Sequence, residues 1–182
     1  MGHDGLVTVV HRYTSAAIPQ QVLEQAHDLV FESFGAGYTD EDWANALGGW
    51  HVVVTEGVVV AHAAVVIRIL HVGAREVGAG YVESVATRLG HEGRGLGSLA
   101  LREIATIIEA QAELGALSTG RHSFYERLGW ERWQGPTFVR HASGDERTPE
   151  EDDGVMVLRT GSSSDIDLAA PITCHDRAGD AW

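Results

Sequence analysis

The sequence predicts an α/β fold in which helices flank a central sheet of mixed strand directions. Short runs rich in valine and isoleucine alternate with helical patterns along the 182 residues. Two of these runs are joined by a tight turn, which makes them antiparallel. A glycine-rich turn leads from a further strand into a long amphipathic helix. The length suits one domain, so we expect a single domain over residues 1–182.

The first quarter of the chain contains a predicted strand and two predicted helices. We expect the strand at Leu6–Val10. Apolar side chains recur at helical spacing over Pro19–Phe34, with proline at the start. Thr39 precedes three acidic residues, which is typical of a helix N-cap and first turn. That second helix should end at Gly48-Gly49.

The rest of the chain continues the alternation of strands and helices. Strands are predicted at 50–55 and 58–70 around a Glu56-Gly57 hairpin turn, and another at 78–87. A long helix should run from Leu96 to Leu114 and end at Gly115. The remaining expectations are a strand at Ala116–Ser118, a helix at His122–Leu128, a solvated acidic loop at Ser143–Asp153 and a strand at Val155–Arg159.

Charge and composition exclude several classes of function. The formal net charge is −13, and all 13 basic residues are arginines, so no lysine can act as nucleophile or phosphate ligand. Such a chain would repel duplex nucleic acid and attract a polycationic small molecule, and an acidic surface that serves solubility alone fits the composition better still. Cys174 is the only cysteine, so we expect a structural thiol and no disulfide. No histidine pattern indicates a metal site, and His62 in an apolar strand is predicted to be a core residue.

Nothing in the sequence indicates export or membrane insertion. Met1–Gly5 has no basic region, and no sustained apolar run follows it. The longest apolar stretch, Val58–Ile67, is interrupted by His62 and is too short to span a bilayer. We therefore expect a cytoplasmic protein.

The turn Gly93-Arg94-Gly95-Leu96-Gly97 lies between a predicted strand and the long helix. A helix N-terminus offers unpaired backbone N–H groups that suit a phosphate, and glycines let the backbone approach it. The spacings of the Rossmann and P-loop motifs are absent. Anion binding and a plain connecting turn both fit this pattern on its own.

Two ordered motifs resemble the GNAT superfamily of acetyl-coenzyme A-dependent N-acetyltransferases. They are the strand Tyr81–Thr87 followed by Glu92–Gly97, and the later Phe124–Trp130 with its tyrosine and Leu-Gly-Trp. Glu92 departs from the family's arginine or glutamine at that position. The resemblance implies acetyl-CoA as cofactor, contacted by Val85, Ala86, Thr87, Glu92, Gly93, Arg94, Gly95, Leu96, Gly97 and Ser98.

Within the superfamily, the chain is similar to the aminoglycoside 2'-N-acetyltransferases from about Phe34 to its last residue. The segments that carry this similarity are Asp42-Trp43, Leu47–Gly49, Ala61–Val65, Gly80–Glu83, Leu114–Ser118, Gly135–Thr137 and Arg177–Trp182. The resemblance implies transfer of acetyl to the 2'-amino group of an aminoglycoside, a resistance activity, in a homodimer. At Gly37 the relatives carry aspartate, so one substrate contact is in question.

The same resemblance implies roles for individual residues. Glu83 would act as base through a water molecule, assisted by the Trp182 carboxylate, and Tyr125 as acid at the cofactor sulfur. The substrate's ammonium groups would be bound by a largely acidic set: Asp42, Glu83, Ser84, Ser118, Glu150, Glu151, Asp152, Asp180 and Trp182. Which of the three consecutive acids 150–152 makes the contact is open.

Two other functional hypotheses also fit the sequence. The chain could acetylate another small amine, such as a polyamine or a cell-wall or thiol precursor. It could also be a non-catalytic acyl-CoA-binding module. The sequence gives neither the physiological substrate nor the preferred aminoglycoside.

Overall fold

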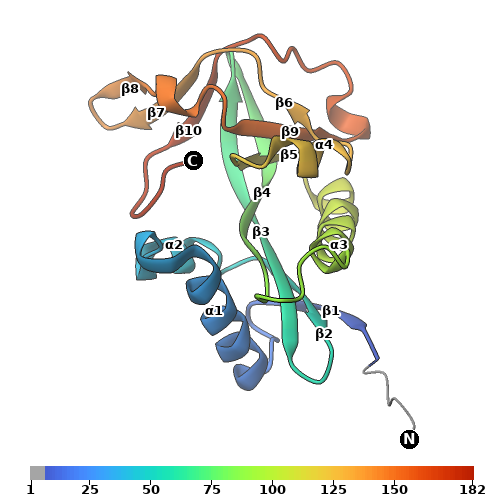
Figure 1. Cartoon of the computed structure of the whole chain (residues 1–182). Coiled ribbons are helices and arrows are strands. Elements are labelled where there is room, and N and C mark those ends of the chain that lie inside the picture. The colour runs from blue at the N-terminus through green and yellow to red at the C-terminus, as the bar shows by residue number, and fades with distance from the viewer. Residues whose placement is uncertain (1–6) are drawn as a thin grey trace, which may run out of the picture. The chain divides into compact units, whose positions relative to one another are not determined.

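The computed structural model describes residues 7–182, which form two compact units (Figure 1). The first comprises Met1–Val65, described from residue 7 onward, and Glu83–Ile104; the second comprises Val66–Val82 and Ala105–Trp182. Strands β3 (Val59–Val72) and β4 (Arg75–Thr87) and helix α3 (Leu96–Gln111) each pass from one unit into the other. The single-domain expectation stays a prediction.

The first unit packs helices against an antiparallel arrangement of strands. Besides its parts of β3, β4 and α3, it contains β1 (Val9–Thr14), α1 (Gln20–Phe34), η1 (Gly35–Gly37), α2 (Asp40–Asn45) and β2 (Trp50–Thr55). β2 pairs antiparallel with both β1 and β3, and the β2–β3 register shifts between Val54 and Thr55. α1 buries Ala26, Leu29 and Val30 in a core shared with these strands.

The second unit contains most of the sheet. Its own elements are β5 (Leu114–Ser118), α4 (His122–Glu126), β6 (Glu131–Arg132), β7 (Thr137–His141), β8 (Gly144–Arg147), η2 (Pro149–Glu151), β9 (Val155–Arg159), η3 (Gly161–Ser163) and β10 (Ile172–His175). The strand order is β6-β9-β5-β4-β3-β10-β7-β8. β4–β5 and β10–β7 are parallel pairs, whereas β5–β9 and β7–β8 are antiparallel. The predicted mixture of strand directions is therefore present.

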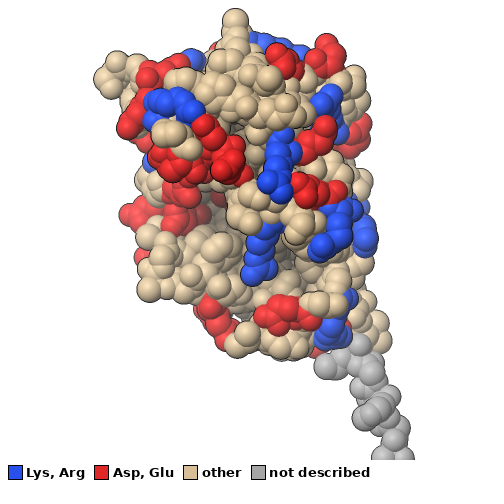
Figure 2. Space-filling model, turned by 45° about the horizontal axis from the view of Figure 1, so that its top comes forward, with Lys and Arg blue, Asp and Glu red and all other residues tan. Residues whose placement is uncertain are grey.

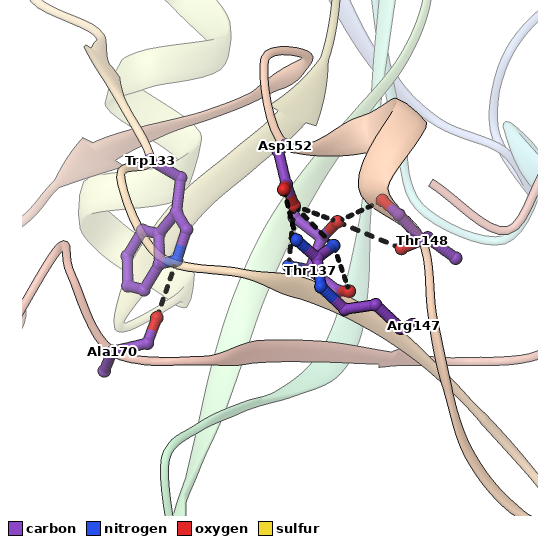
Figure 3. A network of polar contacts seen from close by, with 6 residues as sticks. All are labelled: Trp133, Thr137, Arg147, Thr148, Asp152 and Ala170. Atoms are coloured by element: carbon purple, nitrogen blue, oxygen red, sulfur yellow. Dashed lines mark hydrogen bonds and ion pairs between the residues drawn. The ribbon is translucent and has the colours of Figure 1, made fainter.

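The core of the second unit is built around buried aromatic side chains. Tyr81, Trp133 and Trp182 lie in it with Leu114 and Ile172 from neighbouring strands. The Trp133 indole donates from Nε1 to the Ala170 carbonyl over 2.9 Å, which satisfies its only polar atom (Figure 3). Cys174, which is buried with its pKa raised by burial to about 11, is part of the same core.

Several elements were predicted correctly from the sequence. α1 covers the predicted helix, with Pro19 at its N-cap, and β2 and β9 have the predicted bounds. Thr39 caps α2 as expected: its side chain accepts a hydrogen bond from the Asp42 N–H over 3.2 Å. The first predicted strand starts late, at Val9, and Leu6 and Met1–Gly5 lie outside the described residues.

Other expectations about the elements were wrong. The segment 143–153 is not one loop, because β8 pairs with β7 and η2 follows it. α2 ends at Asn45, and tighter turns occupy the residues before Gly48. α3 ends at Gln111 because the Glu113 N–H bonds instead to Gly78 O, over 2.8 Å, and Leu114 begins β5. α4 ends at Glu126, before Leu128.

Candidate active site

One residue within strand β4 lies in the left-handed region. Ser84 has φ 54°, and it is the only non-glycine residue with positive φ among residues 7–182. This conformation costs an L-residue about 1–2 kcal/mol, so neighbouring groups must hold it. The Ser84 hydroxyl is hydrogen-bonded to the Tyr38 hydroxyl, and the Ser84 carbonyl accepts from His62 Nδ1 over 2.8 Å. Hydrogen bonds to its side chain and to its carbonyl therefore hold Ser84 in this conformation.

The glycine-rich turn between β4 and α3 needs its glycines for backbone conformation. Gly90, Gly93 and Gly95 have φ 81°, 74° and 79°. A Cβ added at Gly93 or Gly95 would meet no heavy atom within 4 Å, so the space beside the turn is open. α3 begins at Leu96, and the first N–H groups of a helix have no partner within it. The turn thus presents N–H groups beside open space, which suits an anion.

The arginine of this turn is already held by a carboxylate. Arg94 donates from Nη1 and Nη2 to the two oxygens of Glu56, over 3.0 and 2.7 Å, in a bidentate pair. Thr8 donates to the same carboxylate over 2.7 Å. These hydrogen bonds to Arg94 and Thr8 lower the pKa of Glu56. Arg94 therefore ties the turn to the β2–β3 hairpin.

Glu92 turns its side chain back onto its own loop. Its carboxylate accepts from the Gly90 N–H over 2.6 Å, at an exposed position. The residue thereby stabilises the turn that Gly90 begins.

Of the first-unit acids, one belongs to a helix cap and another lies in β4. Asp42 accepts from Thr39 N over 2.9 Å and from Thr39 Oγ1 over 2.8 Å, so one of its oxygens completes the α2 capping box. Glu83 is half-buried and immediately precedes Ser84 in β4. Gly37 is exposed in η1, and a Cβ there would meet nothing within 4 Å.

In the second unit, Tyr125 lies on α4 with its ring packed between aromatic neighbours. Phe124 and Trp130 contact it edge-on, with ring centroids 5.0 and 5.9 Å away. Burial raises the pKa of Tyr125 to about 12, although Arg121 opposes the shift. The phenol is therefore protonated at neutral pH, as a proton donor must be.

Ser118 at the end of β5 is paired with one of the three consecutive acids. Its hydroxyl donates to Glu151 Oε2 over 2.8 Å. Burial raises the pKa of Glu151, as do Asp180 and Glu150, against the effect of the Ser118 hydrogen bond. Gly154 makes this pair possible, because a Cβ there would lie 2.7 Å from Ser118 Oγ and 3.2 Å from Glu151 Oε2. Glu150 itself is exposed.

Asp152 is engaged in a separate network (Figure 3). Its Oδ1 accepts from Thr137 N over 3.0 Å, from Thr137 Oγ1 over 2.9 Å and from Arg147 Nη1 over 2.7 Å, while Oδ2 accepts from Arg147 Nη2. These bonds, led by that to Arg147, lower the pKa of Asp152 to about 2. The network ties η2 to β7, so Asp152 has a structural role.

The C-terminal segment is anchored by backbone and side-chain contacts. The Trp182 N–H donates to Asp180 Oδ1 over 3.1 Å, and Arg177 Nε donates to the Asp180 carbonyl over 2.6 Å. The Trp182 ring is buried in the second-unit core. Cys174 Sγ lies 3.3 Å from the Ala181 carbonyl and donates to it.

The predicted site residues thus fall into two groups. Asp42, Glu83 to Thr87 and Glu92 to Ser98 belong to the first unit; Ser118, Tyr125, Glu150 to Asp152, Asp180 and Trp182 belong to the second. The structure adds residues that were not singled out from the sequence for the site: Ser15, Tyr38, His51 and Gly154. His62 is buried and hydrogen-bonded as predicted, but its bond to Ser84 connects it to the site.

Figure 2 shows acidic side chains over much of the visible face, with the largest group at its upper left. Within residues 7–182, no three His, Cys, Asp or Glu side chains are grouped so as to hold a metal ion. None of the helices in the same range is long and apolar enough to cross a membrane.

Comparison with known proteins confirms the fold. The family model "Acetyltransferase (GNAT) domain" matches residues 16–133. A GNAT family N-acetyltransferase from Escherichia coli, solved in complex with CoA, superposes with a TM-score of 0.67 at 15% identity, over 98% of this chain and 97% of that one. A GCN5-related N-acetyltransferase from Kribbella flavida gives 0.60 at 23% identity over 75% of this chain, which spans only 36% of that protein.

The chain therefore belongs to the GNAT family of acetyltransferases. It is also 38% identical, over 98% of its length and 94% of the other protein, to the aminoglycoside 2'-N-acetyltransferase of Mycolicibacterium fortuitum. This match confirms the resemblance that the sequence motifs indicated.

Proposed function

We propose that this protein transfers the acetyl group of acetyl-CoA to the 2'-amino group of aminoglycosides, and thereby confers resistance. The observation that carries the proposal is the 38% identity to an aminoglycoside 2'-N-acetyltransferase over nearly the whole of both chains. The excess of 26 acidic over 13 basic residues supports a polycationic substrate. The proposal includes a cytoplasmic homodimer, as the resemblance implies.

The turn before α3 fits the pyrophosphate of acetyl-CoA. Its glycines adopt positive φ next to open space, and the first turn of α3 offers N–H groups. We assign this contact to the backbone of Gly93 to Ser98, because Arg94 is paired with Glu56 and Glu92 with Gly90. Val85, Ala86 and Thr87 of β4 would bind the pantetheine arm through their backbone. When bound, the cofactor supplies an acyl thioester open to attack by an amine.

Residues of this chain would transfer the protons and stabilise the negative charge that develops during the reaction. Glu83, half-buried in β4, would remove a proton from the attacking ammonium group through a water molecule, assisted by the Trp182 carboxylate. The N–H of Val85 would stabilise negative charge on the carbonyl oxygen. Tyr125 would hold the proton that the sulfur receives, consistent with its raised pKa.

The substrate's other ammonium groups would meet the remaining acids. Among the three consecutive carboxylates the contacts favour Glu151, because it is half-buried, its pKa is raised in part by Asp180 and Glu150, and it accepts a hydrogen bond from Ser118 whereas Asp152 accepts four. A bound cation would relieve the repulsion between these carboxylates. Asp42, which completes the α2 capping box, would contribute a further carboxylate. Ser84, Ser118 and Glu150 complete the proposed set.

Thiol release from acetyl-CoA tests the proposal with two matched drugs. Kanamycin B or tobramycin carries a 2'-amino group, whereas kanamycin A carries a 2'-hydroxyl. Release with the first and not the second is expected. Equal release with both would overturn the 2' assignment but keep acetyl transfer to an aminoglycoside, and release only with other amines would overturn the drug substrate.

A second arm separates an enzyme from a binding module. Tyr125→Phe and Glu83→Gln should lower kcat by about 10²-fold or more, as expected for loss of a proton-transfer group, while acetyl-CoA binding by calorimetry is retained. A wild-type protein that binds acetyl-CoA and acetylates no amine would contradict the enzymatic proposal.

A further inference from the structure

A one-way chain of hydrogen bonds crosses the first unit and ends on Ser84. The Gly48 N–H donates to Ser15 Oγ over 2.9 Å, and Ser15 Oγ lies 2.9 Å from His51 Nε2. His51 Nδ1 lies 3.0 Å from His62 Nε2, and His62 Nδ1 lies 2.8 Å from the Ser84 carbonyl. Both histidines are fully buried.

The direction of this chain follows from its last acceptor. A carbonyl oxygen can only accept, so His62 carries its proton on Nδ1 and, when neutral, accepts at Nε2. His51 must then donate from Nδ1 and accept at Nε2, where Ser15 donates over 2.9 Å in preference to the Gly49 carbonyl, which lies 3.3 Å away. Burial lowers the pKa of His51 to about 4 and that of His62 to about 3, so both rings are neutral near pH 7. All four bonds therefore point toward Ser84, and aligned bonds strengthen one another.

The Ser84 carbonyl and the Val85 N–H belong to one peptide group. No peptide bond among the described residues is cis, so these two groups point in opposite directions. A donor that fixes the carbonyl therefore fixes the N–H, and the positive φ of Ser84 makes that orientation unusual for a strand. Polarising the carbonyl also makes the N–H a better donor.

We propose that His62, supported by His51, is a positioning residue that aims and polarises the Val85 N–H toward the carbonyl oxygen of the acetyl group. This inference rests on the proposed acetyl transfer and deepens it. Trp43 packs against His62 with ring centroids 5.7 Å apart, and in such a surrounding both ring nitrogens need partners, which the chain supplies.

Paired substitutions separate positioning from packing. In His62→Asn the amide nitrogen can occupy the place of Nδ1 and donate to Ser84; in His62→Gln the amide reaches the place of Nε2 and leaves the Ser84 carbonyl without its donor. Both remove the ring and should lose similar stability. We expect kcat to fall about 10-fold or more in the Gln variant, since loss of an oxyanion donor costs about 10²–10³-fold, with KM for the amine unchanged. The Asn variant should stay within about threefold of wild type.

A readout independent of turnover is the backbone amide resonance of Val85 in 15N-labelled protein without acetyl-CoA. It should shift in His62→Gln and remain near its wild-type position in His62→Asn. Thr160→Val, which removes a buried hydroxyl bonded to the Glu113 carbonyl over 2.5 Å in the second unit, is the control for general loss of a buried hydrogen bond. It should change stability without moving the Val85 resonance or kcat.

Equal kcat in the two His62 variants, or an unmoved Val85 resonance in His62→Gln, would overturn the positioning role. Should both His62 variants fail to fold, His51→Asn and His51→Gln can be compared in the same way. The Asn variant keeps a donor to His62 Nε2, and the Gln variant removes it. If wild-type protein acetylates nothing, the proposed function fails, while the Val85 resonance still decides whether the chain orients this peptide.

Discussion

Each unit holds a segment of the proposed site in place with polar side chains, but by different chemistry. In the first unit, His51 and His62 are neutral, fully buried and bonded in a single direction to the backbone of Ser84. In the second, the Asp152 carboxylate is partly exposed, charged, and accepts several bonds at once from Thr137 and Arg147. A chain of neutral groups fixes the orientation of the backbone group at its end. A charged carboxylate surrounded by donors holds its segment in place and tolerates contact with solvent.

The largest expected difference between the two networks is in acid. An unfolded histidine binds a proton near pH 6.5, whereas folded His51 and His62 do so only near pH 4 and 3. The unfolded state therefore binds more protons below pH 6.5, and stability falls as the pH falls. Each histidine should cost about 2 kcal/mol between pH 7 and 5, at about 1.4 kcal/mol per pKa unit.

Urea unfolding at pH 7 and pH 5 measures this loss. His62→Asn removes one of the two titrating groups, so its loss should be about 2 kcal/mol smaller than that of wild type. The Asp152 network cannot contribute in this window, because its carboxylate titrates only near pH 2. An equal loss in both proteins would contradict the assigned pKa values.

The second-unit network should break on substitution of its carboxylate. Asp152→Ala leaves the buried Thr137 N–H without an acceptor, at a cost of about 2 kcal/mol, whereas the Thr137 hydroxyl still donates to the Thr148 carbonyl over 2.6 Å. KM for the aminoglycoside should change little if the network is structural. Asp153→Ala is the matched control at an exposed neighbour and should stay within about 0.5 kcal/mol. A large rise in KM for Asp152→Ala would indicate instead that Asp152 contacts the substrate.

A smaller effect is expected at Gly154, which lies against two residues of the proposed substrate site. Gly154→Ala would push its Cβ against Ser118 and Glu151, which should cost about 1 kcal/mol of stability. Displacing the carboxylate should also raise KM for the aminoglycoside by about threefold to tenfold, since 1.4 kcal/mol is tenfold. Gly120→Ala, where a Cβ meets nothing within 4 Å, serves as control in the same kinetic assay.

The smallest effect should come from the residue that departs most from the family motif. Glu92→Gln keeps an acceptor for the Gly90 N–H at an exposed position, so stability should change by less than about 0.5 kcal/mol. KM for acetyl-CoA should stay within about twofold. A large decrease of this KM would show that the negative charge of Glu92 opposes cofactor binding.

Elements with a strong apolar pattern were predictable from the sequence, and short polar strands were not. Val22, Leu29 and Val30 mark α1 by their spacing, and Val52 to Val54 mark β2. β8 is exposed along its whole length, so no apolar alternation signals it. β10 has only four residues, and its pairing with β7 and β3 depends on contacts distant in sequence.

The same limit applies to the site. The glycine turn and Tyr125 stand in local motifs, but the partnership of His51 and His62 depends on the register of two strands. A two-residue turn at Glu56-Gly57 would place residue 51 directly opposite residue 62, which is not the register observed. The observed register pairs Val53 with His62, which keeps both histidines on one face as diagonal neighbours. The left-handed Ser84 has no local signal, because serine does not demand that conformation.

The pairing of Arg94 with Glu56 has a consequence for inhibitor chemistry. Because the guanidinium already gives two N–H groups to a carboxylate, the proposed recognition of the cofactor's pyrophosphate at the turn before α3 would fall mainly to main-chain amides. Substitutions that change side chains leave such amides in place. A compound that competes with acetyl-CoA through these amides would therefore be harder to escape by mutation than one designed around the arginine.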